Sequence, residues 1–152
     1  MLCYLPGLKE RILIMNEIGQ YLEKAGITPT PVRMLVYGCL RDSRSPMSLS
    51  DIETKLETVD KSSISRTISL FRRHDLLHSI EDGSGSSKYE LWTSHKTNED
   101  SGAHVHFRCI KCGETLCLES VKIPDVKLPE GFKKKEINYV IVGYCPECSD
   151  KN

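Results

Sequence analysis

Two pairs of closely spaced cysteines in the last third of the chain limit most strongly what it folds into. Cys109 and Cys112 form one C-x2-C pair, and Cys145 and Cys148 form the other. Each such pair makes a tight turn whose backbone amides donate to sulfur, and two turns together supply the four thiolates of a closed tetrahedral zinc site. We therefore predict a structural Zn2+ on these four cysteines. Two disulfides, unrelated surface cysteines and a mononuclear iron site with the same ligands are the alternatives.

The composition describes a folded protein without a membrane segment. Of the 152 residues, 39% are hydrophobic and 28% are charged, which excludes a fully disordered chain. No run approaches the ~18 apolar residues of a membrane span. Lys9, Glu10 and Arg11 stand where a signal peptide has its apolar core, and the cysteine count of seven is odd. We therefore expect a cytoplasmic protein with metal or thiol chemistry, no membrane partner and no disulfide framework.

Charge and patterning divide the chain into two parts. The 21 basic and 21 acidic side chains cancel, so bulk charge does not hold nucleic acid or a membrane. The polar stretch 93–102 lacks periodicity and separates a hydrophobic first part from the cysteine-rich end. We predict a first domain over residues 1–93, a hinge over 94–103 and a zinc-binding second domain over 104–152.

Apolar periodicity and capping residues predict four helices and a hairpin in the first domain. Thr30 before Pro31 is typical of a helix start, and Ser48 and Asp51 have the spacing of a capping box. The expected helices cover residues 14–25, 31–40, 48–56 and 62–74, and the expected strands cover 76–80 and 88–92. Three helices followed by a hairpin describe a winged helix-turn-helix, here preceded by one further helix. The predicted fold class is α+β.

The fourth predicted helix has an apolar face and a face suited to DNA. Ile64, Ile68 and Phe71 share one side at helical spacing. The opposite side carries serines and an arginine, and residues 61–73 hold four basic and no acidic side chains. Small hydroxyls and arginine suit the major groove and its phosphates. The predicted DNA contacts are Lys61, Ser62, Ser65, Arg66, Ser69, Arg72 and Arg73. An ordinary solvated helix face is the alternative.

A second group of metal-ligand residue types lies near the first cysteine pair. His104 and His106 alternate along a strand-like segment, which puts both imidazoles on one face. Cys117 stands in the next strand-like segment, and Glu90 in the hairpin reaches the same place if the domains fold together. We predict a second, regulatory metal on Glu90, His104, His106 and Cys117, with surface or core side chains as the alternative.

From about Gly26 to Ser149, the chain resembles the ferric uptake regulator family of metal-dependent repressors. The motifs that carry the resemblance are Ile27–Arg33 (ITPTPVR), Ser63–Ile68 (SISRTI), Lys88–Leu91 (KYEL), His104–Gly113 (HVHFRCIKCG) and Gly143–Cys148 (GYCPEC). The resemblance implies a homodimeric winged-helix repressor of double-stranded DNA with a C-terminal α/β dimerisation domain. It also implies structural zinc on the knuckle cysteines and a regulatory metal at the hinge. Residues 1–14 then form an extension outside the family pattern.

The chain departs from the family pattern at several positions. Cys117 takes the place of a carboxylate, Ser65 takes the place of a tyrosine, and no histidine stands near Pro46. The family's long helix in the second domain has little room, because residues 121–132 contain two prolines. We therefore expect dimerisation through strand pairing over 135–143.

These features favour a zinc-responsive repressor. The soft thiolate of Cys117 favours zinc over iron(II) or manganese(II) as the second metal. An iron- or peroxide-responsive repressor is one alternative, and a zinc-stabilised protein-interaction module without specific DNA binding is another. An enzyme acting on a small molecule is not expected, because the four-cysteine site is closed and no HExxH motif is present.

Overall fold

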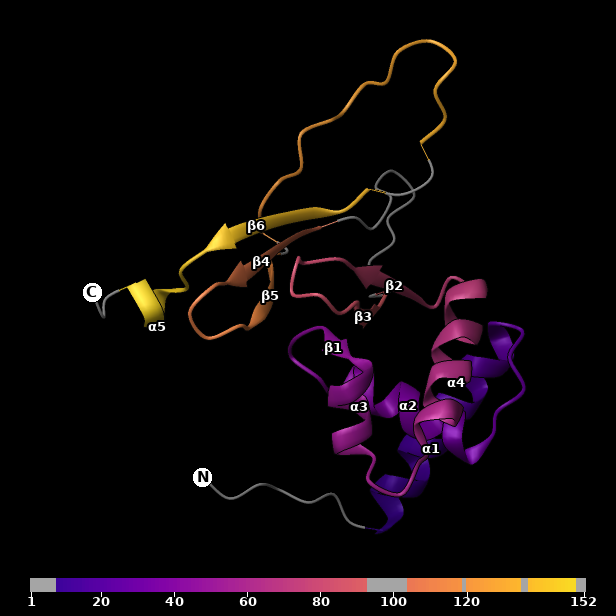
Figure 1. The fold of residues 1–152 in the computed structure, drawn as a ribbon. Coiled ribbons are helices and arrows are strands. Elements are labelled where there is room, and N and C mark those ends of the chain that lie inside the picture. The colour runs from indigo at the N-terminus through magenta and orange to yellow at the C-terminus, as the bar shows by residue number, and fades with distance from the viewer. Residues whose placement is uncertain (1–7, 93–103, 119, 135–136, 150–152) are drawn as a thin grey trace.

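The computed structural model describes residues 8–92, 104–118, 120–134 and 137–149. Its helices α1–α4 gather in one part of the molecule, and a hairpin lies between them and a second sheet (Figure 1). The predicted mixed α+β class is confirmed. The hinge predicted over 94–103 lies outside the described residues. None of the helices described here is both long and apolar enough to cross a bilayer.

The first two helices are α1 (Leu8–Lys24) and α2 (Pro31–Arg41). Helix α1 begins six residues earlier than its apolar pattern predicts. Helix α2 begins as predicted, because the Thr30 hydroxyl accepts from the amide of Arg33 and Pro31 occupies the first turn.

Helix α3 (Leu49–Lys55) and helix α4 (Lys61–Arg73) complete the helix-turn-helix. The capping box at Ser48 and Asp51 is present, as predicted. Asp60 caps α4 by accepting from the amide of Ser63 at 2.9 Å. The predicted ends of α4 are each within one residue of those observed.

The hydrophobic core lies between these helices and the hairpin. Phe71, Ile64 and Ile52 are fully buried, with Leu22 and Val36 from the first two helices. The apolar face predicted for α4 therefore packs inward and leaves its serines and arginines outside. Burying one large apolar side chain contributes about 1.5–3 kcal/mol to the free energy of unfolding. This core is therefore the main source of stability in the first half of the chain.

The hairpin strands β2 (Leu77–Ile80) and β3 (Lys88–Leu91) form the wing. They pair antiparallel, and β3 also pairs with the short strand β1 (Met47–Ser48), giving the order β1-β3-β2. Strand β1 was not predicted, since two residues carry no periodic signal.

The second sheet consists of β4 (Val105–Cys109), β5 (Thr115–Leu118) and β6 (Tyr139–Gly143). Its order is β5-β4-β6, with β4 antiparallel to β5 and parallel to β6. One helical turn, α5 (Pro146–Ser149), follows. Residues 120–134 hold no helix, as their prolines predict, and extend away from the sheet (Figure 1).

Candidate metal centres and recognition groove

The two cysteine pairs come together at one end of the second sheet. Cys109 ends β4, and Cys112 lies in the following turn. Cys145 directly precedes α5, and Cys148 lies within it. All four sulfur atoms lie within 4.8 Å of one another, and those of Cys112 and Cys145 are 3.9 Å apart. A tetrahedron with Zn–S bonds of about 2.3 Å requires S···S distances of about 3.8 Å. The four cysteines are not disulfide-bonded, and their spacing fits a zinc ion.

The thiols interact strongly with one another and with nearby amides. Hydrogen bonds from the backbone amides of Cys112 and Cys145 lower the pKa of Cys109 to about 6. In contrast, a hydrogen bond to Cys145, together with burial, raises the pKa of Cys148 to about 12. The turns therefore favour a thiolate at Cys109, while the thiol of Cys148 resists a second negative charge. A bound cation is what allows all four to ionise.

A second convergence joins the wing to the second sheet. Four side chains have ligand atoms within 4.8 Å of one another: His78 from β2, Glu90 from β3, His104 just before β4 and His106 in β4. We call these four residues the hinge cluster. The Nε2 atoms of His104, His78 and His106 lie 2.8, 3.1 and 3.2 Å from the same oxygen, Oε2 of Glu90. Three imidazoles around one carboxylate oxygen is the arrangement expected around a divalent cation.

Burial and charge in the hinge cluster also fit a cation. His106 is 2% exposed, and its Nδ1 has no hydrogen-bond partner among the described residues. Burial opposes the negative charge of Glu90, but hydrogen bonds from the three imidazoles outweigh it and hold the pKa of this carboxyl well below its usual range. The cluster therefore presents an ionised carboxylate with three imidazole nitrogens around it.

The hinge cluster differs in one member from the set predicted from the sequence. Glu90, His104 and His106 come together as predicted, but the fourth member is His78 rather than Cys117. Cys117 lies opposite His106 in the β4–β5 register and is not part of the four-residue group. The signal for His78 was present, since the predicted strands 76–80 and 88–92 place it opposite Glu90 when their inner ends pair.

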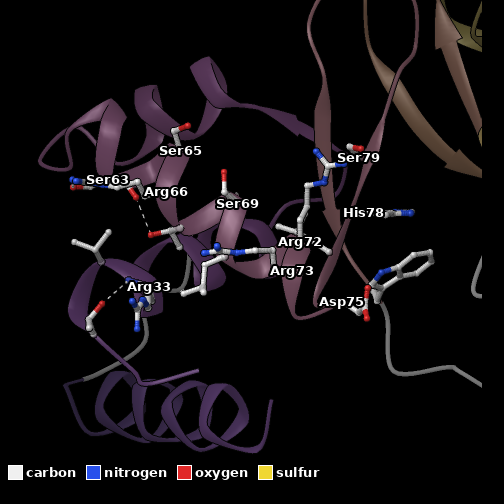
Figure 2. A pocket seen from close by; sticks show the side chains of 16 residues that line it. Arg33, Ser63, Ser65, Arg66, Ser69, Arg72, Arg73, Asp75, His78 and Ser79 are labelled. Atoms are coloured by element: carbon white, nitrogen blue, oxygen red, sulfur yellow. Dashed lines mark hydrogen bonds between the residues drawn. The ribbon is translucent and has the colours of Figure 1, made fainter. Parts of the chain in front are cut away.

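The outer side of α4 borders an open groove of about 960 Å³. Side chains from α4, from the start of α2 and from the wing strand β2 surround it (Figure 2). Its lining includes five of the seven predicted DNA contacts, which are Ser65, Arg66, Ser69, Arg72 and Arg73. Lys61 and Ser62 lie at the start of α4, outside the lining, and the Ser62 hydroxyl donates to the cap residue Asp60 at 2.5 Å.

The groove is strongly basic and includes residues that sequence reasoning missed. Arg33 at the start of α2 joins Arg66, Arg72 and Arg73, whereas Asp75 is the single acidic residue of the lining. The Arg33 guanidinium donates to the carbonyl of Thr28 at 2.6 Å, which holds it at the groove. Four guanidinium groups on one face give a neutral chain a local site for a polyanion.

Residues 24–141, more than half of the chain, match the sequence model that describes the ferric uptake regulator family. The chain belongs to this family. Members of the ferric uptake regulator family are metal-responsive transcription regulators, not enzymes, and they bind DNA and form dimers. The resemblance drawn from the motifs is thereby confirmed. A comparison with curated protein sequences gives no match.

Solved structures of ferric uptake regulator proteins share the fold at low sequence identity. The Vibrio cholerae ferric uptake regulator is 18% identical with a TM-score of 0.61, covering 84% of this chain and 98% of that one. The Helicobacter pylori protein, described with three functional metal-binding sites, is 18% identical with a TM-score of 0.59, covering 97% of both chains. The holo form of XcZur is 14% identical with a TM-score of 0.60, covering 91% of this chain and 98% of that one.

Proposed function

We propose that this protein is a homodimeric transcriptional repressor whose affinity for its DNA operator depends on a divalent metal bound at the hinge cluster. The observation that carries this proposal is the convergence of three imidazoles and one carboxylate from both halves of the chain. A metal held by these ligands fastens the wing strands β2 and β3 to β4. The position of the first half relative to the second then depends on the metal.

The hinge cluster and the recognition groove share one residue, which gives metal binding a direct route to DNA. His78 contributes a ligand atom to the cluster and also lines the groove. Its ring lies against that of Trp92, another lining residue, with a centroid distance of 4.2 Å. Fixing His78 therefore fixes a wall of the groove. In a dimer, the same constraint sets the spacing between two recognition helices.

We propose zinc for both sites, with different roles. Zn2+ on Cys109, Cys112, Cys145 and Cys148 would stabilise the fold of the second sheet. Three histidines and one glutamate form a four-donor set of a kind that zinc also accepts. The thiolate of Cys117, which favoured zinc in the sequence analysis, is not part of this set. Iron(II) and manganese(II) are therefore the competing metals that the binding experiment must include.

Arg66 has the most favourable position for contacting DNA from α4. Its exposed side chain lines the groove and donates a hydrogen bond to the Ser63 hydroxyl at 3.2 Å. We expect Arg66→Ala to weaken operator binding by about 5- to 150-fold, the range of a good arginine–base contact of ~1–3 kcal/mol. The measurement is fluorescence anisotropy at fixed salt. Arg44→Ala, at an exposed arginine outside the groove lining, is the matched control, and an equal loss in both variants would argue against this role.

We propose that β6 forms the dimer contact. The sequence likewise predicts dimerisation through strand pairing over 135–143. It is the last strand in the order β5-β4-β6, and Ile141 and Val142 on it are 48% and 55% exposed. An edge strand with exposed apolar residues is a template for pairing with a second copy.

A charge on β6 tests this interface. We expect Val142→Lys to raise the dimer dissociation constant at least tenfold, because pairing would bury the new charge. Sedimentation of the metal-loaded protein measures the effect. Val126→Lys, at an exposed valine in residues 120–134, is the control. An unchanged dimer in Val142→Lys would place the interface elsewhere.

A further inference from the structure

The wing meets the second sheet at two places, and the hinge cluster accounts for one of them. The other lies at the wing tip, where residues 81–87 join β2 to β3. Asp82 in this tip is 2% exposed, although a carboxylate is rarely buried without a partner. Its position therefore requires an explanation that the hinge cluster does not supply.

Both oxygens of the Asp82 carboxylate have polar partners, and one of these partners lies in the second sheet. Oδ2 lies 2.9 Å from Nζ of Lys88 and accepts from the Thr115 hydroxyl at 2.5 Å. Oδ1 accepts from the amide of Ser84 at 2.9 Å, which closes the turn at the tip. Thr115 is the first residue of β5, so this contact crosses between the two halves of the chain. Asp82, Lys88 and Thr115 are called the tip clasp below.

Neighbouring contacts reinforce the tip clasp. Nζ of Lys88 also donates to the Thr115 hydroxyl at 2.6 Å and to the carbonyl of Gly113 at 3.5 Å. Nη1 of Arg108 donates to the backbone carbonyl of Asp82 at 3.3 Å. Gly113 directly follows Cys112, so the turn that carries the cysteine pair also receives the wing.

The electrostatics of the tip clasp need no metal ion. One carboxylate faces one ammonium, and the shared hydroxyl accepts from the ammonium and donates to the carboxylate. Burial acts to raise the pKa of Asp82, but hydrogen bonds from Ser84 and Thr115 and the contact with Lys88 outweigh it and hold that pKa well below its usual range. Removing one partner of such a buried pair leaves the other charge uncompensated, which is strongly unfavourable. The hinge cluster, in contrast, gathers three imidazoles on one oxygen and gains its full strength from a cation.

We propose that the tip clasp is a metal-independent tether between the wing and the second sheet, and that it pre-positions the hinge cluster for its metal. With the tip fastened, the base of the wing moves about a fixed point, and metal binding closes the base alone. Asp82, Lys88 and Thr115 are therefore positioning residues. They raise metal affinity because less of the binding free energy goes into ordering the wing.

Hydrogen exchange on the protein with zinc retained on the four cysteines and the hinge metal removed tests the tether. We expect amides of residues 81–88 to stay protected without the hinge metal, while those of 77–80 and 104–106 exchange faster. Asp82→Asn is expected to expose the tip in both states. Glu81→Gln is the matched control, because the Glu81 carboxylate contacts Ser87 within the same tip. Equal loss of protection at tip and base on metal removal, or unchanged tip protection in Asp82→Asn, would overturn the proposal.

Zinc titration followed by Trp92 fluorescence tests the pre-positioning, a part that rests on the proposed function. If loss of the clasp lowers the fraction of competent wing to a tenth, the apparent dissociation constant of zinc rises about tenfold. We expect this rise in Asp82→Asn and in Thr115→Val. In Thr115→Ser, which keeps the hydroxyl, we expect the zinc affinity of the unaltered protein. If Asp82→Asn and Thr115→Val both bind zinc as tightly as the unaltered protein, the pre-positioning is contradicted. If neither zinc nor iron(II) nor manganese(II) binds the hinge cluster, the proposed function fails, whereas tip protection that depends on Asp82 still supports the tether.

Discussion

Replacing Cys145 with serine is expected to release the zinc that we propose on the four cysteines and to unfold the second sheet, while α1–α4 stay folded. From residue 104 onward, the buried hydrophobic side chains of the described chain are Val105, Cys109 and Cys145, two of which are the ligands themselves. So small a core does not offset the chain entropy of three strands. A structural zinc supplies an apparent ~10–16 kcal/mol at neutral pH, which is folding free energy in such a domain.

Zinc content, far-ultraviolet circular dichroism and thermal unfolding measure this prediction together. The expected result is loss of one equivalent of zinc per chain and of the strand signal, with a remaining helical transition. Cys39→Ser is the matched control, because Cys39 is a half-buried cysteine of α2 outside the metal clusters. Native strand content in Cys145→Ser at reduced zinc would show that the sheet folds without the metal.

Replacing His78 with alanine is expected to abolish the metal response while the fold persists. Loss of a residue that only supports a metal ligand costs 10–100-fold in affinity, so loss of a ligand should cost at least a hundredfold. The hinge cluster would keep two imidazoles and Glu90. Because His78 also lines the groove, DNA binding at saturating metal should weaken as well.

Zinc binding to the hinge cluster, measured by competition with a chelating dye, checks this prediction. His74→Ala is the control, since the His74 ring bonds the carbonyl of Ala25 and is not among the clustered ligands. Cys117→Ser provides the contrast with the ligand set predicted from the sequence, and we expect a much smaller effect from it. A large loss in Cys117→Ser beside a small loss in His78→Ala would reverse the assignment.

Local signals explain most of what the sequence predicted correctly. Thr30, Pro31, Ser48 and Asp51 act within one turn of their own helices, and their capping contacts are all present. The two cysteine pairs carry their geometry in their spacing, so the four sulfurs meet as expected. Strand β1 was not predicted, because two residues give no periodic pattern. Helix α1 begins earlier than its apolar pattern predicts.

The parts that the sequence did not predict depend on how the two halves meet. The predicted hairpin already places His78 opposite Glu90, but only the packing of the wing on β4 shows that His78, and not Cys117, joins the cluster. Asp82 and Thr115 form a buried pair across 33 positions of the chain, for which neither position carries a local signal. Arg33 reaches the groove because α2 lies beside α4, which is again a tertiary effect.

The most direct test is DNA binding as a function of the hinge metal. Protein with zinc retained on the four cysteines and no other metal is titrated with labelled DNA from its own upstream region, at fixed salt. Zinc, iron(II) and manganese(II) are then added separately, with His78→Ala and Arg66→Ala as comparisons. We expect tight, sequence-specific binding with zinc, and loss of this response in His78→Ala. Specific binding of equal affinity with and without added metal, or no specific binding in any state, would contradict a metal-dependent repressor.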